Sequence, residues 1–156
     1  MSKIKVNQAR IAENRRANYE YEIREKIEAG LVLQGSEVKS LRVGRASITE
    51  AYAGEDKGRL MLFNVNIPVY EPAQSNHEPK RPRELLVTAR ERNRMLGLLK
   101  REGMTLVPLN LYFNNRGLAK MQLGLAKGRR KHDKRQVEKS RSWQRDKARI
   151  LNRRNN

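Results

Sequence analysis

The side chains best suited to chemistry in this sequence are cations, and they cluster near its end. The stretch GLAKGRRKHDKRQ, residues 124–136, places six Lys and Arg side chains around one His and one Asp. Such cations pair with phosphates, and the release of counterions from a nucleic acid drives their binding. A His can stack on a purine and donate to a phosphate. This stretch therefore predicts contact with a nucleic acid.

Side chains for catalysis or metal binding are sparse. The sequence has no phosphate-binding loop, no glycine-rich dinucleotide fingerprint and no HExxH motif. Its two histidines, His77 and His132, lack a second ligand at metal spacing, and the acidic run 54–56 falls at a turn signal. We therefore expect no enzyme activity, no cofactor and no metal. The absence of cysteine fits a reducing cytosol.

Charge is the strongest signal in the composition. The 156 residues carry 35 Lys and Arg against 17 Asp and Glu, a net charge of +18. Residues 127–156 hold 13 of the basic and 3 of the acidic residues. This excess favours a nucleic acid over a membrane, because neither terminus has the broad apolar face of an interfacial helix. Without an apolar run of about 20 residues or a secretory signal, we expect a cytoplasmic protein.

Residue alternation predicts several strands. Apolar and aromatic residues at odd positions of 19–27 indicate a half-buried strand, which resumes after Gly30. The turn signal DKG at 56–58 predicts a hairpin whose second strand runs over 59–70, and the proline-rich stretch that follows predicts a loop. A final hairpin is expected over 105–126. On its first strand one face is expected to carry Val107, Leu109, Leu111 and Phe113.

Two helices are expected between these strands. Residues 35–44 have helical spacing, with Ser36 as the expected N-cap. A longer helix is expected to begin after Thr88, which forms a capping box with Glu91, and to end at Gly103.

This order of elements fits a small antiparallel barrel of the oligonucleotide-binding (OB) type, with a ferredoxin-like sandwich as the competitor. We expect a mainly β fold with peripheral helices, divided into a basic N-terminal arm (1–18), an OB-like barrel (19–126) and a basic tail (127–156). The tail has too few apolar residues to offset its ordering entropy by burial. We expect it to be disordered when free and helical, with Asp133 as N-cap, once phosphate neutralises its charges.

Six stretches carry a resemblance that covers nearly the whole chain. They are ENRRA (13–17), EAGLVLQGSEVKSLRVGRA (28–46), NIPVYE (66–71), NHEPKRPRELL (76–86), GMTLVPLNLYF (103–113) and GLAKGRRKHDKR (124–135). In this order and at this spacing they resemble the SmpB family, which binds transfer-messenger RNA (tmRNA) in bacterial ribosome rescue. The resemblance implies an OB-like barrel that binds the tRNA-like domain of tmRNA. It also implies delivery to the A site of stalled 70S ribosomes for trans-translation, with elongation factor Tu involved indirectly through alanyl-tmRNA.

The resemblance also assigns residues in the barrel. Seven positions match tmRNA contacts of the family: Asn14, Arg15, Arg16, Tyr19, Glu28, Leu86 and Thr88. The family often has His where this chain has Tyr19, and His or Asn where it has Thr88. A carboxylate such as Glu28 suits an RNA site only if it accepts from base amino groups or orients a neighbouring Arg, and a strand-end salt bridge is the alternative. Further candidates for contact with RNA phosphates are Lys39, Arg42, Arg83 and Lys127.

In the tail, the resemblance implies a helix on the ribosome that probes the decoding centre of 16S rRNA and the empty mRNA channel. The residues assigned to these contacts are His132, Asp133, Lys134, Arg135, Trp143, Ile150 and Leu151. A different class of protein fits the same composition: a constitutive basic ribosomal protein that binds rRNA. Copy number after a high-salt wash of ribosomes distinguishes the two, because a structural component stays near one copy per particle.

Overall fold

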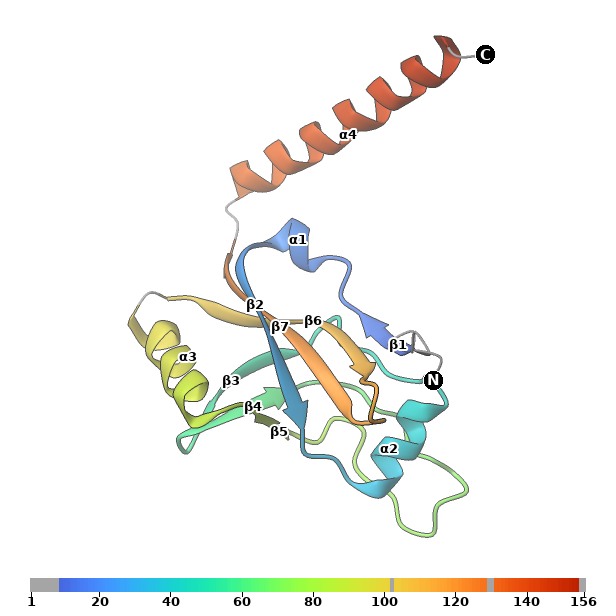
Figure 1. Cartoon of the computed structure of the whole chain (residues 1–156), viewed down its shortest axis with the longest axis vertical. Coiled ribbons are helices and arrows are strands. Elements are labelled where there is room, and N and C mark those ends of the chain that lie inside the picture. The colour runs from blue at the N-terminus through green and yellow to red at the C-terminus, as the bar shows by residue number, and fades with distance from the viewer. Residues whose placement is uncertain (1–8, 102, 129–130, 155–156) are drawn as a thin grey trace, which may run out of the picture.

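The computed structural model of the chain describes residues 9–101, 103–128 and 131–154, and Figure 1 shows its mainly β architecture with helices at the periphery. In chain order the elements are β1 (Ala9–Glu13), α1 (Ala17–Glu20), β2 (Tyr21–Leu31), α2 (Gly35–Arg42), β3 (Tyr52–Asp56), β4 (Arg59–Phe63), β5 (Arg83–Leu86), α3 (Ala89–Arg101), β6 (Thr105–Phe113), β7 (Ala119–Gly128) and α4 (Lys131–Arg154). This confirms the predicted fold class.

Strand pairing closes the sheet into a barrel. The strand order is β1-β6-β3-β4-β5-β2-β7, all antiparallel, and β7 pairs with β6 as well as with β2. The strands from β2 to β7 therefore form a closed ring. One edge of β6 pairs with β7. Its other edge pairs with β1 over residues 110–113 and with Ala53 of β3 at Leu106. Residues 9–13, which we assigned to the N-terminal arm, are thus a strand on the barrel.

The start of β2 differs from the prediction. Tyr19 belongs to the short helix α1, and β2 begins at Tyr21 and runs without interruption through Gly30 to Leu31. Gly30 continues the strand because its backbone pairs with Leu86 of β5 on one side and Lys120 of β7 on the other. A glycine in a strand can mark close packing as well as an interruption.

A β-bulge divides the core into two parts. The register between β6 and β7 shifts between Pro108 and Asn110. Leu111 consequently lies in the main core, whereas Val107 and Leu109 lie in a second cluster below α1. The expectation that these three share one face is wrong, because an extra residue in a strand reverses the alternation beyond it.

The predicted hairpin at DKG is present, and its turn is made by Lys57 (φ 51°) and Gly58 (φ 76°). Positive φ at both central residues is typical of the two-residue turns that match strand twist. Its second strand ends at Phe63 rather than continuing over 59–70, because Asn64 adopts a left-handed conformation with φ 65°. Alternation alone gives no sign of that turn.

Helix α2 is present as expected, but its cap is Gln34. The Gln34 side chain accepts from the first turn, and its backbone N–H donates to Glu37 Oε1 at 2.9 Å, which completes a capping box. Ser36 instead directs its hydroxyl to Nδ1 of the buried His77, 2.8 Å away. The other ring nitrogen of His77 lies 2.8 Å from the carbonyl of Ile67, so this imidazole anchors the loop before β5.

Helix α3 begins and ends as predicted. The backbone N–H of Glu91 donates to Thr88 Oγ1 at 3.2 Å, and Gly103 ends the turn after the helix with φ 60°. Within α3 Met95 is the fully buried residue. The leucines of this helix pack half-buried against the main core.

Helix α4 projects from the barrel beyond α1 (Figure 1). Residues 138–152 are exposed throughout. Asp133, expected as the N-cap, is the third residue of the helix. The disorder of this tail in the free protein, and its ordering by RNA, stay predictions.

Candidate nucleic-acid interface

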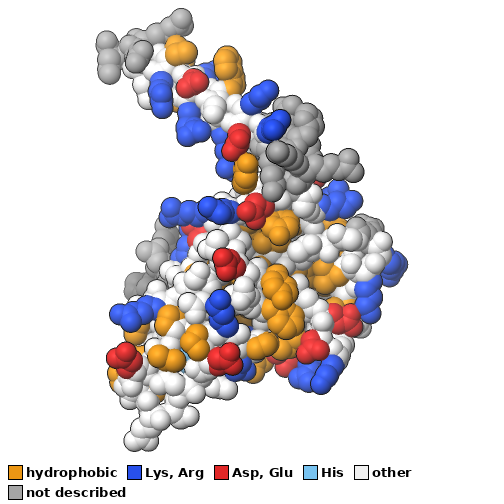
Figure 2. Space-filling view, turned by 180° about the vertical axis from the view of Figure 1, so that it is seen from behind, with side chains coloured by type: hydrophobic (Ala, Val, Ile, Leu, Met, Phe, Trp, Pro, Cys, Tyr) orange, Lys and Arg blue, Asp and Glu red, His pale blue; other side chains and the backbone are white. Residues whose placement is uncertain are grey.

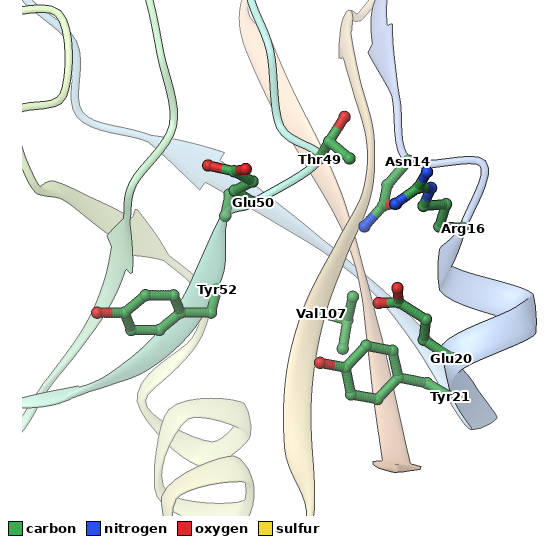
Figure 3. Close-up of a pocket in the computed structure, with 9 residues that line it drawn as sticks. Asn14, Arg16, Glu20, Tyr21, Thr49, Glu50, Tyr52 and Val107 are labelled. Atoms are coloured by element: carbon green, nitrogen blue, oxygen red, sulfur yellow. The ribbon is translucent and has the colours of Figure 1, made fainter. Parts of the chain in front are cut away.

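A pocket of about 330 Å³ lies where β1 leads into α1. Figure 3 shows Asn14, Arg16, Glu20 and Tyr21 on one side of it and Glu50 and Tyr52 on the other. The pocket combines a guanidinium, an amide and two phenols with carboxylates at its sides. Such a mixture suits a nucleotide better than an apolar ligand.

Asn14 is fixed at the rim of this pocket by the bulged strand β6. Its backbone N–H donates to the Leu109 carbonyl at 2.9 Å, and its Nδ2 donates to the Pro108 carbonyl at 3.2 Å. Its Oδ1 is buried without a hydrogen-bond partner among the described residues. Arg15 and Arg16 are exposed, and Arg15 Nε lies 3.7 Å from Glu13. The two arginines therefore present their charge to solvent, which a phosphate contact requires, and the contact itself stays a prediction.

Tyr19 connects α1 to α4 rather than standing on a strand. Partial burial raises the pKa of its phenol, and the Glu138 carboxylate, to which it hydrogen bonds, raises it further. The phenol therefore stays protonated near neutral pH and can donate. This contact places the start of the tail helix beside the segment that carries Asn14 and Arg16.

Glu28 lies exposed on the outer surface of β2, and its partner is a tyrosine. The Tyr112 hydroxyl of β6 donates to the Glu28 carboxylate. Burial, and then this bond, raise the pKa of Tyr112 well above its usual value. We expected Glu28 either to accept from base amino groups or to orient a neighbouring arginine. Among the described residues no arginine contacts its carboxylate, so the second role has no partner.

Leu86 and Thr88 have different environments. Leu86, 52% exposed, lines a groove of about 390 Å³ together with Gly30, Arg42 and Lys120. Because Gly30 pairs with Leu86 and with Lys120, these side chains share the outer surface that carries Glu28. Thr88 uses its hydroxyl to cap α3. We call the outer surface formed by Glu28, Leu86, Tyr112, Lys120 and Gln122 the β2–β7 face.

Arg83 does not contact RNA phosphates, and this prediction is corrected. It is 1% exposed, and its Nε donates to Glu37 Oε2 at 2.6 Å while Nη1 donates to the Val65 carbonyl at 2.6 Å. Arg81 reaches the other oxygen of Glu37 at 2.5 Å. The basic residues around Arg83 led us to expect a phosphate contact there. Arg81 and Arg83 instead pair with Glu37 and hold the loop before β5 against α2.

The other candidate cations are accessible to different degrees. Arg42 lines the groove beside Leu86, and Lys39 lies 6.0 Å from the ring centroid of Tyr70, within range of a cation–π contact. Lys127 is half-buried near the end of β7, opposite Glu22.

The tail residues lie along one helix. Trp143, Ile150 and Leu151 are 69%, 56% and 50% exposed. Trp143 and Ile150 are seven residues apart and so lie on the same side of α4, with Leu151 adjacent. His132, Asp133 and Lys134 form part of the first turn, with side chains outside the described residues, and Arg135 is exposed.

Sequence reasoning missed four side chains that border these sites: Arg10, Asn110, Tyr112 and Gln122. Three of them stand on the last hairpin, where polar residues alternate with buried ones. That alternation was the available signal. It marks an outward face but gives no partner for it.

The described ranges contain no group of three or more His, Cys, Asp or Glu able to hold a metal ion. No helix among them has the length and apolar character needed to cross a membrane. Figure 2 shows basic side chains along α4 and around the barrel, with acidic ones between them.

Comparisons with known proteins identify the family. The family model described as SmpB protein matches residues 11–153. The SsrA-binding protein of Rhodospirillum rubrum is 57% identical over 148 residues, covering 94% of this chain and 92% of that relative. The SsrA-binding protein of Caulobacter sp. (strain K31) is 54% identical over 142 residues, covering 90% and 93%.

A solved structure agrees in sequence and fold. The chain described under the words "tmRNA-SmpB: a journey to the center of the bacterial ribosome" is 47% identical and aligns with a TM-score of 0.63. The alignment covers 79% of this chain and 90% of that one. Because both the family model and the relatives span nearly the whole sequence, this chain belongs to the SmpB protein family.

Proposed function

We propose that this protein binds the tRNA-like domain of tmRNA and delivers it to the A site of stalled ribosomes for trans-translation. The β2–β7 face carries this proposal. Strand pairing brings Glu28 and Leu86 to neighbouring strands of one surface, with Arg42 and Lys120 beside them. A hydrophobic side chain that is half exposed between cations suits a base and its phosphate. The names of the relatives, SsrA-binding proteins, support the same partner.

The pocket at Asn14 and Arg16 is the second part of the proposed RNA surface. Arg15 and Arg16 supply charge for phosphates, and the unpartnered Oδ1 of Asn14 can accept from a base after a small side-chain shift. Tyr19 lies next to both, in α1. We leave Thr88 out of the proposed surface, because its exposed hydroxyl already accepts a bond as the cap of α3; its RNA contact stays a prediction.

The tail has a separate proposed role. We assign His132, Asp133, Lys134 and Arg135 to the decoding centre, and Trp143 with Ile150 and Leu151 to the empty mRNA channel. An exposed tryptophan and an aliphatic pair on one side of a basic helix are costly in water unless a partner covers them. Delivery by elongation factor Tu then depends on alanyl-tmRNA rather than on a surface of this chain. The protein acts by binding, without catalysis of its own.

Truncation after Gly128 tests this division of roles. The shortened protein should bind the tRNA-like domain with an affinity within a few-fold of the full chain at matched salt, because the barrel surfaces are intact. It should fail to support peptide tagging on ribosomes stalled at the end of a truncated message. Ordinary alanine tRNA serves as the competitor. Equal affinity for both RNAs would reduce the protein to a non-specific polycation, and tagging without the tail would refute the role given to α4.

A further inference from the structure

The Glu28 carboxylate is held in place by a hydrogen bond from Tyr112, which lies two strands away in the sheet. Tyr112 is only 9% exposed, and its hydroxyl donates to Glu28 Oε2. The raised pKa of this phenol keeps it a donor at any physiological pH. Among the described residues no donor reaches the other oxygen, Oε1. An exposed glutamate is thus fixed at one oxygen and open at the other.

A polar pocket of about 270 Å³ adjoins this pair. It is lined by Arg10, Asn110, Tyr112 and Gln122. Gln122 lies directly between Glu28 and Asn110 in the sheet register. Asn110 Nδ2 donates to Gln122 Oε1 at 2.8 Å, which orients the Gln122 amide and leaves its NH₂ group available to donate. Asn110 Oδ1 is buried without a partner in the described part of the chain.

These groups form a fixed pattern of acceptors and donors on the barrel surface. Glu28 only accepts, and the Gln122 NH₂ donates beside it. Arg10, at the other side of the pocket, donates through Nη1 to Glu13 at 3.0 Å, and its guanidinium has further N–H groups that can donate. Of the four RNA bases, guanine alone offers two adjacent donors, N1–H and N2–H, next to an acceptor, O6. The open oxygen of Glu28 can accept one donor and the second lone pair of Oε2 the other, while an amide or guanidinium donates to O6. Uracil presents an acceptor, O2, in place of the second donor, adenine presents an acceptor, N1, in place of the first, and cytosine presents acceptors in place of both.

We propose that Tyr112 is a positioning residue that holds Glu28 so that this pocket reads the edge of one unpaired guanine in the bound RNA. The inference rests on the proposed function and names the group on the RNA that the β2–β7 face recognises. The hydroxyl restricts a side chain with three rotatable bonds before RNA arrives, which reduces the ordering cost of binding. The aromatic ring is 9% exposed and lines the pocket, so its proposed contribution is the hydroxyl that orients Glu28.

A double-mutant cycle tests the positioning role. The probe is the transcribed tRNA-like domain of tmRNA, titrated at fixed salt against the full-length protein, Y112F, E28A and the double variant. Y112F should weaken binding roughly fivefold, as expected for the loss of one productive hydrogen bond. In the E28A background the same change should have no further effect, because Tyr112 acts through Glu28. Y70F, a tyrosine outside the β2–β7 face, is the matched control and should bind as the parent does.

Base identity is tested separately. Each unpaired guanine of the probe is replaced in turn by inosine, which lacks the N2 amino group but keeps O6 and N1–H. One position should weaken binding about tenfold for the parent protein, and E28Q should abolish that discrimination. Thermal melting of every variant reports whether the fold is kept. Equal losses for Y112F with and without Glu28, or no inosine-sensitive position, would overturn the inference. Failure of the parent to prefer this RNA over alanine tRNA would instead overturn the proposed function.

Discussion

Removing the charge of Glu37 should destabilise the barrel more than any comparable change at its surface. Glu37 is fully buried and accepts from two guanidinium groups, with Arg81 at 2.5 Å and Arg83 at 2.6 Å. E37Q keeps the shape of the side chain and its bond from the Gln34 backbone, yet leaves Arg83 as a buried cation whose remaining counter-charge is the exposed Glu78. Arg83 cannot move into water without breaking its bond to the Val65 carbonyl.

The expected magnitude follows from that burial. Breaking a buried ion pair by removing one partner costs about 3–5 kcal/mol. We expect the lower end of this range, about 3 kcal/mol, because the glutamine amide oxygen still accepts one bond. For a folded unit of this size such a loss lowers the melting temperature by about 10 °C.

The matched control is E25Q. Glu25 of β2 also makes a two-point contact with an arginine, Arg94 of α3, at 2.6 and 2.9 Å. These side chains are 40% and 47% exposed, so water screens the pair and its loss should cost no more than about 1 kcal/mol. Unfolding of the barrel should be followed by far-UV circular dichroism. Tryptophan fluorescence is unsuitable, because Trp143 lies on the exposed tail helix and not in the barrel. A loss for E37Q equal to that for E25Q would refute the reasoning.

The pH dependence gives a second arm of this experiment. Burial alone would raise the pKa of Glu37, but the Gln34 N–H and the charges of Arg81 and Arg83 outweigh it and lower that pKa below its usual value of 4.5. A carboxyl with a lowered folded pKa stabilises the fold above its unfolded pKa and loses this effect as pH falls through the folded value. The parent should therefore exceed E37Q in stability most at neutral pH, and the gap should narrow below about pH 4.5.

Two other expectations address the barrel surface and the tail. Leu86→Ala should weaken RNA binding severalfold with little change in melting temperature, because Leu86 is half exposed. Thr88→Ala should instead cost about 1 kcal/mol of stability as a lost cap and leave RNA binding unchanged. Melting and RNA titration of both variants check the contrast, and the reverse pattern would show that Thr88 contacts RNA. Amides of 131–154 should exchange rapidly with solvent in the free protein and become protected on stalled ribosomes, measured by hydrogen exchange, and strong protection in the free protein would contradict the expected disorder.

Much of the fold could be predicted because local chemistry determined it. Thr88 and Gly103 bound α3 where capping rules place them, and Lys57 with Gly58 makes the expected turn. What alternation could not give were the bulge after Pro108 and the left-handed Asn64. Both are single-residue conformations. Pro108 cannot donate to a strand ladder and asparagine tolerates positive φ, so each residue type is compatible with its conformation, but period-two alternation does not identify either position.

The candidate site shows the same limit. Arg15 and Arg16 are exposed as predicted, but Arg83 has the same residue type in an equally basic run and is buried. Its burial depends on Glu37, which lies far away in sequence and faces it only once α2 packs beside β5. Tyr112 was missed for the converse reason. The alternation of polar and buried residues identifies Tyr112 as a strand residue. Only the pairing of β6 with β7, and of β7 with β2, brings it to Glu28.

The distribution of charge separates selective binding by the barrel from general attraction of the tail to phosphate. About half of the net charge of +18 lies in residues 127–156, most of which form helix α4. Cations of this kind bind any phosphate backbone and lose their effect as salt rises. The β2–β7 face instead combines a leucine, an amide and a carboxylate held by Tyr112. A carboxylate repels phosphates, so Glu28 weakens binding to every RNA that does not offer it a donor. Selectivity for one folded RNA therefore requires the barrel, while the tail supplies attraction wherever phosphate surrounds it.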